Sequence, residues 1–266
     1  MGDASLFAAR YGPVALVAGA SEGLGAAFAG ALAARGLDLV LLARRSGPLE
    51  ATAASLRKDH GVQVHTCALD LASDNVVPAL QSLGLRHEFG LIVYNAAYAP
   101  VGPMLEQDPA CLLRAVDVNV RGPLLVLRTL LPSMKRREHG GVVLMSSLAG
   151  SQGTPRVATY AATKAFNTVL GEGLWKELRA HGLDVVVSCA GAIATPGYAQ
   201  ASSDAKRPAP GTLPPAAVAH ETLRALGKGP RITPGWLNKI AGFIIGRLLP
   251  RRWAVAVMAA STKSLT

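Results

Sequence analysis

Aromatic residues, cysteines and acidic residues are scarce in this sequence. Aromatic side chains make up 5% of the 266 residues, and no basic-aromatic pattern typical of nucleic-acid binding appears. Because no recognised nucleic-acid motif is present either, we expect no nucleic-acid binding. Cys67, Cys111 and Cys189 lie far apart and lack metal-ligand spacing. We therefore predict no metal site, and we expect each thiol to fill core volume in a reducing cytosol.

Targeting signals and long apolar runs are also missing. No signal-peptide pattern follows Met1, which predicts a cytoplasmic protein. Half of the residues are hydrophobic, which is enough for one domain with a sizeable core. The net charge of +10 comes mostly from arginines spread along the chain. Such a surface can simply be solvated, or it can attract anionic lipid, a phosphorylated substrate or an acidic carrier protein.

A glycine-rich stretch organises the rest of the chain. Residues 14–18 form a continuous apolar run, typical of a buried parallel strand, and residues 26–34 have a helical pattern. Glycines between them allow unusual backbone angles and a close approach of phosphate, and the N-terminus of a helix favours an anion. The alternative is a tight strand-to-helix turn without a ligand. The candidate phosphate-binding residues are Gly19, Ser21, Glu22, Gly23, Leu24 and Gly25.

Strands and helices alternate along the chain. Apolar runs predict strands at 13–18, 38–43, 62–69, 91–94, 142–145, 184–189 and 231–233. Helical patterns predict helices at 24–35, 47–60, 74–83, 108–137, 156–181 and 214–227. This order predicts an α/β fold, a doubly wound parallel sheet with helices on both faces. We expect a dinucleotide-binding domain over residues 1–235, with a substrate loop at 194–213 that is mobile from 197, and a helical extension over 236–266.

The residues after the second strand predict the type of cofactor. In a dinucleotide fold an acid near this position would hold the adenosine ribose hydroxyls, but Ala43 cannot do so. Arg44 follows, with Arg45 behind it, and a guanidinium suits a 2′-phosphate. This predicts NADP(H). Both arginines could instead lie on the surface at a strand end, and Glu22 argues against a strong NADP preference.

Two further strand ends predict ligand contacts. Asp70 and Leu71 follow the third strand. There, a carboxylate can accept a bond from an adenine amino group, and it can also cap the next helix near Ser73. Asn95, Ala96 and Ala97 follow the fourth strand, and these small residues leave room for a flat ligand.

Four polar residues later in the chain are candidates for catalysis. Asn119 lies inside a predicted helix, where asparagine is mildly unfavourable. Ser147 ends the fifth strand, and Tyr160 and Lys164 share one helix face because they are four residues apart. Taken singly, three of these residues also have ordinary interpretations. Asn119 could be a helix irregularity, Ser147 part of a strand-end turn, and Tyr160 a half-buried packing residue.

In this order and at this spacing, the motifs resemble those of the short-chain dehydrogenase/reductases over roughly residues 12–230. The glycine stretch matches Thr-Gly-x-x-x-Gly-x-Gly, and Tyr160 with Lys164 matches Tyr-x-x-x-Lys, with Ser147 thirteen residues earlier. Residues 94–97 match Asn-Asn-Ala-Gly with two departures, and residues 190–191 stand where the family has Pro-Gly. The departures, which concern cofactor-pocket scaffolding, are Ala18, Tyr94, Ala97 and Ala190.

The resemblance implies hydride transfer between a nicotinamide and a carbonyl carbon. Tyr160 would exchange the proton, Ser147 would donate to the oxyanion, and Asn119 would hold a water that feeds protons through Lys164. Lys164 would also lower the pKa of Tyr160 and, with Tyr160, hold the nicotinamide ribose. Gly191, Ile193 and Thr195 would bind the carboxamide and phosphates. A homodimer or homotetramer is implied as well.

Three functions follow as hypotheses. The first is an NADP(H)-dependent reductase or dehydrogenase acting on an apolar small molecule such as a ketone, a sterol or an acyl chain, since the loop at 194–213 carries few charges. The second is a carrier-protein-dependent 3-oxoacyl reductase. The third is a regulator that senses NADP(H) without turnover.

The tail from residue 236 onward has two apolar pieces, 240–246 and 253–258, interrupted by Arg247, Arg251 and Arg252. Neither piece approaches the ~20 residues that span a bilayer. The tail could pack on its own domain near the substrate loop, cover the substrate pocket, form a dimer contact, or lie on an anionic membrane with its arginines as anchors.

Overall fold

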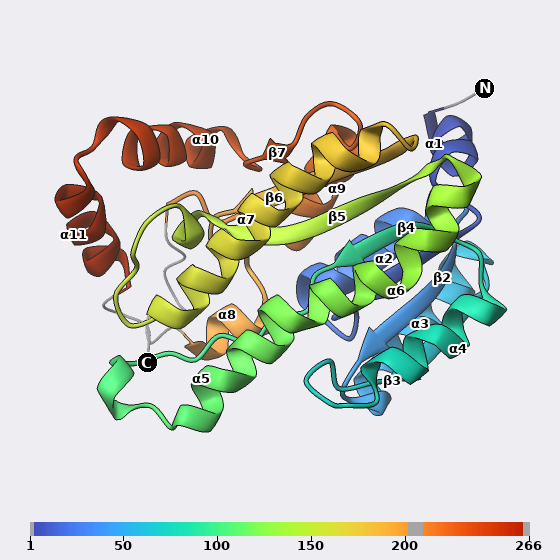
Figure 1. Cartoon of the computed structure of the whole chain (residues 1–266), viewed down its shortest axis with the longest axis horizontal. Coiled ribbons are helices and arrows are strands. Elements are labelled where there is room, and N and C mark those ends of the chain that lie inside the picture. Colours follow the sequence, from blue (N-terminus) through green and yellow to red (C-terminus); the bar gives the residue numbers. More distant parts are fainter. Residues whose placement is uncertain (1–2, 202–209, 263–266) are drawn as a thin grey trace.

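Seven parallel strands form one sheet in the computed structural model, which describes residues 3–201 and 210–262 (Figure 1). The strand order is β3-β2-β1-β4-β5-β6-β7. The strands are β1 Val14–Ala18, β2 Asp38–Ala43, β3 Val64–Ala68, β4 Phe89–Tyr94, β5 Gly140–Ser147, β6 Leu183–Ala190 and β7 Arg231–Ile232. The strands predicted from apolar runs are therefore all present, with ends that differ by a few residues.

Helices cover both faces of this sheet. One face is packed by α2, α3 and α9, and the other by α4, α6 and α7. The predicted doubly wound α/β fold is thus confirmed. The helices are α1 Asp3–Tyr11, α2 Gly23–Ala33, α3 Ser46–His60, α4 Val76–Arg86, α5 Pro109–Val116, α6 Gly122–Arg137, α7 Ala158–Arg179, α8 Pro196–Ala201, α9 Pro215–Ala225, α10 Trp236–Phe243 and α11 Arg251–Ser261.

Strand β4 shows why the strands read as solid apolar runs. Its side chains alternate between the two cores: Leu91 and Val93 pack on the α2 side, while Ile92 and Tyr94 pack on the α6 side. All of its residues are buried, because both faces of the sheet are covered. The chain leaves β3 at one edge and re-enters the sheet at β4 beside β1. Open sheets of this kind bind ligands at the carboxyl ends of the strands next to such a reversal.

Two local predictions differ from the structure. The sequence pattern missed α1, whose Arg10 and Tyr11 side chains both bond to the carboxylate of Asp184. The mobile loop predicted at 197–213 is wrong in its first part, because residues 196–201 form α8. There the Thr195 hydroxyl accepts from the Tyr198 amide at 3.2 Å and a proline occupies the first helical position, where it is well tolerated. Residues 202–209 of that prediction lie outside the described residues.

The C-terminal extension packs on its own domain, as one of the four sequence hypotheses expected. In Figure 1, α10 and α11 (red) lie beyond the carboxyl end of β5, on the side opposite to α1. Arg251 donates to the Ser151 carbonyl at 2.7 Å and Thr262 to the Pro155 carbonyl at 3.1 Å. Within residues 3–201 and 210–262, no helix combines the length and the apolar character needed to cross a membrane.

Candidate active site

A cavity of about 960 Å³ lies at the carboxyl ends of the strands. The glycine stretch, the ends of β2 to β6, the start of α7 and the C-terminal extension all contribute to its wall. Most of the residues that the sequence singled out line it together. They are Gly19, Ser21, Glu22, Gly23, Leu24, Arg44, Arg45, Asp70, Leu71, Asn95, Ala96, Ala97, Ser147, Tyr160, Lys164, Gly191, Ile193 and Thr195. Gly25 and Asn119 support this wall from behind, as the contacts below show.

The glycine stretch folds too tightly to admit side chains. Gly19 has a φ of +80°, and a Cβ there would lie 2.7 Å from the backbone of Ala96. A Cβ on Gly25 would lie 1.8 Å from the Gly19 carbonyl oxygen, which also accepts a bond from the Asn95 side-chain Nδ2 at 3.0 Å. Helix α2 begins at Gly23, so its unpaired first-turn N–H groups lie at the cavity. Exposed backbone amides at a helix N-terminus fit the phosphates of a dinucleotide.

Two arginines follow β2, and only one of them forms an ion pair. The Nη2 of Arg45 lies 2.7 Å from the Oε1 of Glu22 in the glycine stretch. Arg44 also lines the cavity, and no described acid lies within ion-pair distance of it. The carboxylate that argued against NADP is therefore paired with a cation, while the Arg44 guanidinium is available to an anionic ligand.

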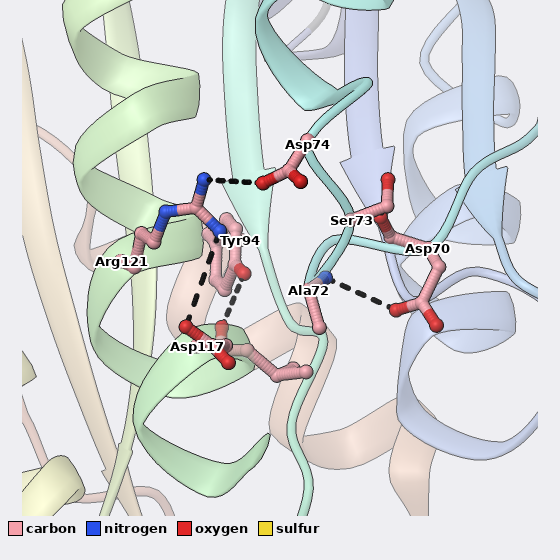
Figure 2. A network of polar contacts seen from close by, with 8 residues as sticks. Asp70, Ala72, Ser73, Asp74, Tyr94, Asp117 and Arg121 are labelled. Carbon is pink, nitrogen blue, oxygen red and sulfur yellow. Dashed lines mark hydrogen bonds and ion pairs between the residues drawn. The ribbon is translucent and has the colours of Figure 1, made fainter. Parts of the chain in front are cut away.

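The Asp70 carboxylate accepts bonds from two described residues. Its Oδ2 accepts from Arg114 Nη2 at 2.6 Å. Its Oδ1 accepts from the Ala72 amide at 3.0 Å, as Figure 2 shows. Burial raises the pKa of this carboxyl, but the bonds from Arg114 and Ala72 outweigh burial and lower it. The predicted helix cap is wrong, because the Asp70 carboxylate accepts from the Ala72 amide and α4 begins only at Val76, with Asn75 as its N-cap.

Tyr94, which departs from the family pattern, supports an irregular helix. Between α5 and α6, residues 117–121 form a π-helical turn, and Tyr94 donates to the Val118 carbonyl at 2.5 Å (Figure 2). A Cβ on Gly122 would lie 2.1 Å from the Tyr94 hydroxyl oxygen, so glycine is required there. Such single π turns are frequent at functional sites. The long predicted helix at 108–137 is therefore present, with this turn in its middle.

The π turn brings Asn119 behind the cavity wall. This side chain is fully buried. Its Oδ1 accepts from the Tyr98 amide, and its Nδ2 donates to the Tyr98 carbonyl, both at 2.8 Å. The Nδ2 also donates to Thr163 on α7 at 3.0 Å. Asn119 thus ties the segment after β4 to the helix that carries Tyr160 and Lys164.

Ser147, Tyr160 and Lys164 meet on one wall of the cavity. Ser147 ends β5, its hydroxyl accepts from the Ala149 amide at 3.2 Å, and it lies close enough to the Tyr160 hydroxyl to act on the pKa of that group. Lys164 lies one helical turn further along α7, with its Nζ 5.5 Å from the centre of the Tyr160 ring. The ammonium is 3% exposed and donates to the Met145 carbonyl at 2.8 Å. The predicted sharing of one helix face is confirmed.

The expected lowering of the Tyr160 pKa is not what the structure gives. Burial raises the pKa of Tyr160, and the Ser147 hydrogen bond opposes this only in part. Burial also lowers the pKa of Lys164 to about 8, because a charged amine loses hydration there. The Lys164 ammonium donates to the Met145 carbonyl. It therefore stabilises the Tyr160 phenolate less than the four-residue spacing of the two side chains suggested.

Apolar side chains line part of the cavity. Ile245 and Met258 of the C-terminal extension contribute to it with Leu148 and Val157, and the same extension adds the polar Asn238, Ser261 and Thr262. Gly191, expected at the cofactor, is also in close contact with this extension, because a Cβ there would lie 2.7 Å from Asn238 Oδ1. Ile193 bridges to Leu213 beside the site.

Sequence reasoning missed several residues of the cavity. Asn238, Gln152 and Tyr98 line it, and Arg114 fixes Asp70. Asn238 stands out within its apolar helix and is buried, with bonds to the Gly211 and Pro234 carbonyls. A single polar residue within an apolar segment was the sequence signal that could have identified Asn238. The other three come from segments whose placement depends on the complete fold. Within the ranges described, no three His, Cys, Asp or Glu side chains lie close enough to hold a metal ion.

Comparisons with known proteins agree with this geometry. A family model described as short chain dehydrogenase matches residues 13–206. The 7beta-hydroxysteroid dehydrogenase of Clostridium sardiniense is 29% identical over 88% of this chain and 89% of its own length. A very-long-chain 3-oxoacyl-CoA reductase of Podospora anserina is 34% identical over 66% of this chain, but this chain spans only 53% of that protein.

Solved structures show the same likeness. A short-chain dehydrogenase from Sphingobium yanoikuyae in complex with NADPH is 28% identical, with a TM-score of 0.76 over 84% of this chain and 87% of its own. A 7beta-hydroxysteroid dehydrogenase structure superposes with a TM-score of 0.88 over 95% of this chain and 98% of its own. At 24% identity the second match shows the fold alone.

Proposed function

The chain belongs to the short-chain dehydrogenase family, an oxidoreductase family, and on that premise we propose that it interconverts a carbonyl and an alcohol on an apolar substrate with NADP(H). One observation carries this proposal. A Ser147–Tyr160–Lys164 cluster, a glycine stretch at a helix N-terminus and an apolar wall all face the same cavity. The cavity therefore has room for a nucleotide on one side and an apolar molecule on the other.

The cofactor half of the cavity suits NADPH through the residues present. The α2 N-terminus and the glycine stretch would hold the pyrophosphate, and Arg44 the 2′-phosphate. Asp70 and Leu71 would border the adenine, while Asn95, Ala96 and Ala97 leave space beside it. Tyr160 and Lys164 would hold the nicotinamide ribose, with Gly191, Ile193 and Thr195 near the carboxamide and phosphates. The NADPH complex of a 28% identical relative supports this choice.

The protein's own residues would handle the proton. When bound, the nicotinamide supplies the hydride. Because burial raises the pKa of Tyr160, its hydroxyl keeps the proton at neutral pH and can donate it to a carbonyl oxygen in the reduction direction. Ser147 would donate to the same oxygen as negative charge develops. The phenolate that results would be stabilised by Ser147 and by the Lys164 ammonium. The water-holding role expected of Asn119 finds no support, because its buried side chain is bonded to Tyr98 and Thr163.

A 3-oxoacyl thioester is the second candidate substrate. The reductase from Podospora anserina supports it by name, and the net charge of +10 suits an acidic carrier protein or an anionic thioester. A hydroxysteroid is supported in the same way by the relative from Clostridium sardiniense. A sensor that binds NADP(H) without turnover remains the third possibility, and loss of Tyr160 or Lys164 would have marked it.

A substrate screen tests this proposal and separates the candidates. Purified protein with NADPH is offered apolar ketones, oxosteroids, 3-oxoacyl thioesters and sugars as matched sets, and NADPH absorbance is followed. We expect turnover with an apolar class and none with sugars. Turnover only with thioesters would select the second candidate. NADPH binding without turnover on any class would favour the sensor.

We also propose a homodimer or homotetramer in a reducing cytoplasm. Large apolar side chains are exposed on neighbouring helices, Leu113 and Leu124 on α5 and α6 and Val169 on α7. Cys67, Cys111 and Cys189 are free thiols. Light scattering after gel filtration should give a multiple of the 27.5 kDa chain mass, and Val169→Asp should reduce it. A monomer at every concentration would contradict this part.

A further inference from the structure

Helix α10 has two unlike faces. One face, with Asn238, Gly242 and then Ile245 just beyond the helix, lines the active-site cavity. These residues recur at intervals of four and three, the spacing of one helix side. The opposite side of α10 carries large apolar side chains exposed to solvent, and α11 exposes two more. We call this set the outer face: Trp236, Leu237, Ile240, Phe243, Ile244, Leu248, Trp253 and Val257.

The outer face exposes more apolar surface than folding alone requires. Trp236 is 69% exposed, Phe243 59% and Trp253 56%. Single exposed apolar residues need no explanation, whereas a contiguous patch of aromatic and aliphatic side chains marks a contact surface. Tryptophan is especially suited to a boundary between water and an apolar phase, because its ring is apolar and its N–H is polar.

Basic residues dominate the extension that carries the outer face. Glu221, whose carboxylate accepts from the Gly235 amide just before α10 at 3.1 Å, is the last acidic residue of the chain, and eight lysines and arginines follow it. Lys239, Arg247 and Arg252 are exposed on the extension itself. Long basic side chains can reach the headgroups of anionic lipids while neighbouring apolar residues enter the boundary region. A second copy of the same face would bring the lysines and arginines of both extensions together, which disfavours self-pairing.

From these observations we propose that the outer face docks on an anionic lipid surface. The extension would lie in the plane of the boundary, with the cavity on the other side of α10. The cavity would then lie close to the bilayer that holds an apolar substrate. That last consequence rests on the proposed function, whereas docking itself does not.

Vesicle sedimentation tests the docking without any turnover. The full chain is mixed with phosphatidylcholine vesicles, with or without phosphatidylglycerol, and the pelleted fraction is measured. Two variants probe the outer face. A triple variant removes large apolar side chains, Trp236→Ser, Phe243→Ser and Trp253→Ser. A double variant reverses charge, Arg247→Glu and Arg252→Glu. Matched controls are Leu85→Ser, which is 90% exposed on α4, and Lys135→Glu with Arg136→Glu on α6. NADPH binding by each variant verifies that it is folded.

We expect the unchanged protein to bind anionic vesicles only, and we expect salt to weaken this binding. Both outer-face variants should lower the partition constant at least about tenfold. The controls should bind like the unchanged protein. A second measurement needs no outer-face variant: in a Trp175→Phe chain, anionic vesicles with brominated acyl chains should quench Trp236 and Trp253 emission. The proposal is overturned if the folded protein neither sediments nor is quenched, whether or not it binds NADPH. It is also overturned if outer-face variants dissociate an oligomer and the unchanged protein ignores vesicles.

Discussion

Arg45 and Glu22 pair across 2.7 Å at the mouth of the candidate cofactor site. The pair joins the residue two positions after β2 to the glycine stretch before α2. The pair neutralises the Glu22 carboxylate, which would otherwise repel a phosphate. It also engages the Arg45 guanidinium, which is then less available to bind the 2′-phosphate itself. Of the two arginines after β2, Arg44 is therefore the one more available to bind a phosphate.

Replacing Arg44 should weaken NADPH specifically. The unchanged protein should prefer NADPH over NADH by at least about tenfold, the scale of one charge-assisted pair of bonds. Arg44→Ala should remove most of that preference and leave NADH binding nearly unchanged, as measured by cofactor titration. Arg136→Ala, on an exposed position of α6, is the control. Equal affinity of the unchanged protein for both cofactors would exclude an NADP-selective site.

Gly25→Ala should abolish cofactor binding. The added Cβ would lie 1.8 Å from the Gly19 carbonyl oxygen, so the glycine stretch must move. Gly47→Ala is the matched control, because no atom lies within 4 Å of the new Cβ and removing a glycine from a helix should be neutral or slightly stabilising. Calorimetric titration with NADPH measures both. Normal binding by Gly25→Ala would mean that the stretch does not form the phosphate cradle.

The stability of the fold should depend on pH through Lys164. Burial lowers its pKa from 10.5 to about 8. Below about pH 8 both folded and unfolded chains carry the charge, and the cost of burying it is fully present. Between about pH 8 and 10.5 the folded chain releases its proton first, so the free energy of unfolding rises with pH.

The expected gain is on the order of 3 kcal/mol relative to Lys164→Met, the equivalent of a shift of about 2.5 units. Urea unfolding of both chains near pH 7 and near pH 10 measures it. Other titrating groups are common to the unchanged protein and to Lys164→Met. The difference between the unfolding free energies of the two proteins therefore reports on Lys164 alone. Parallel pH profiles would show that Lys164 titrates normally.

Removing residues 236–266 should affect substrate more than cofactor. Ile245 and Met258 form part of the apolar wall, while the glycine stretch and Arg44 lie outside the deleted segment. The truncated chain should therefore bind NADPH normally and lose activity most on large apolar substrates. Ile245→Asp in the full chain is a milder version. Unchanged activity of the truncated chain on every substrate would leave the extension as a surface cover.

The strands and their ends could be predicted because they depend on local sequence. A parallel strand buried on both faces appears as an apolar run, as in Val14–Ala18 and Phe89–Tyr94, and polar or small residues follow where the cavity lies. Most of the candidate site follows from that rule alone. The spacing of Tyr160 and Lys164 likewise fixed their common helix face.

What could not be predicted depends on contacts between distant residues. Helix α1 is held by Asp184, more than 170 positions away, and Asp70 is fixed by Arg114. The pKa of Tyr160 depends on burial and on the direction of the Lys164 ammonium, neither of which helical spacing determines. The tail pattern predicted two helices but not which face of α10 turns toward the cavity.

Turnover by Tyr160→Phe tests the central claim most directly. The substitution keeps the ring and removes the hydroxyl that bonds to Ser147, so folding and NADPH binding should persist. With an apolar ketone and NADPH, we expect alcohol formation by the unchanged protein and loss of nearly all of it in the variant, while Lys164→Ala should impair both binding and turnover. If Tyr160→Phe binds NADPH and keeps more than a few per cent of the activity, about what a missing proton donor would leave, then Tyr160 is not the proton donor and the account fails.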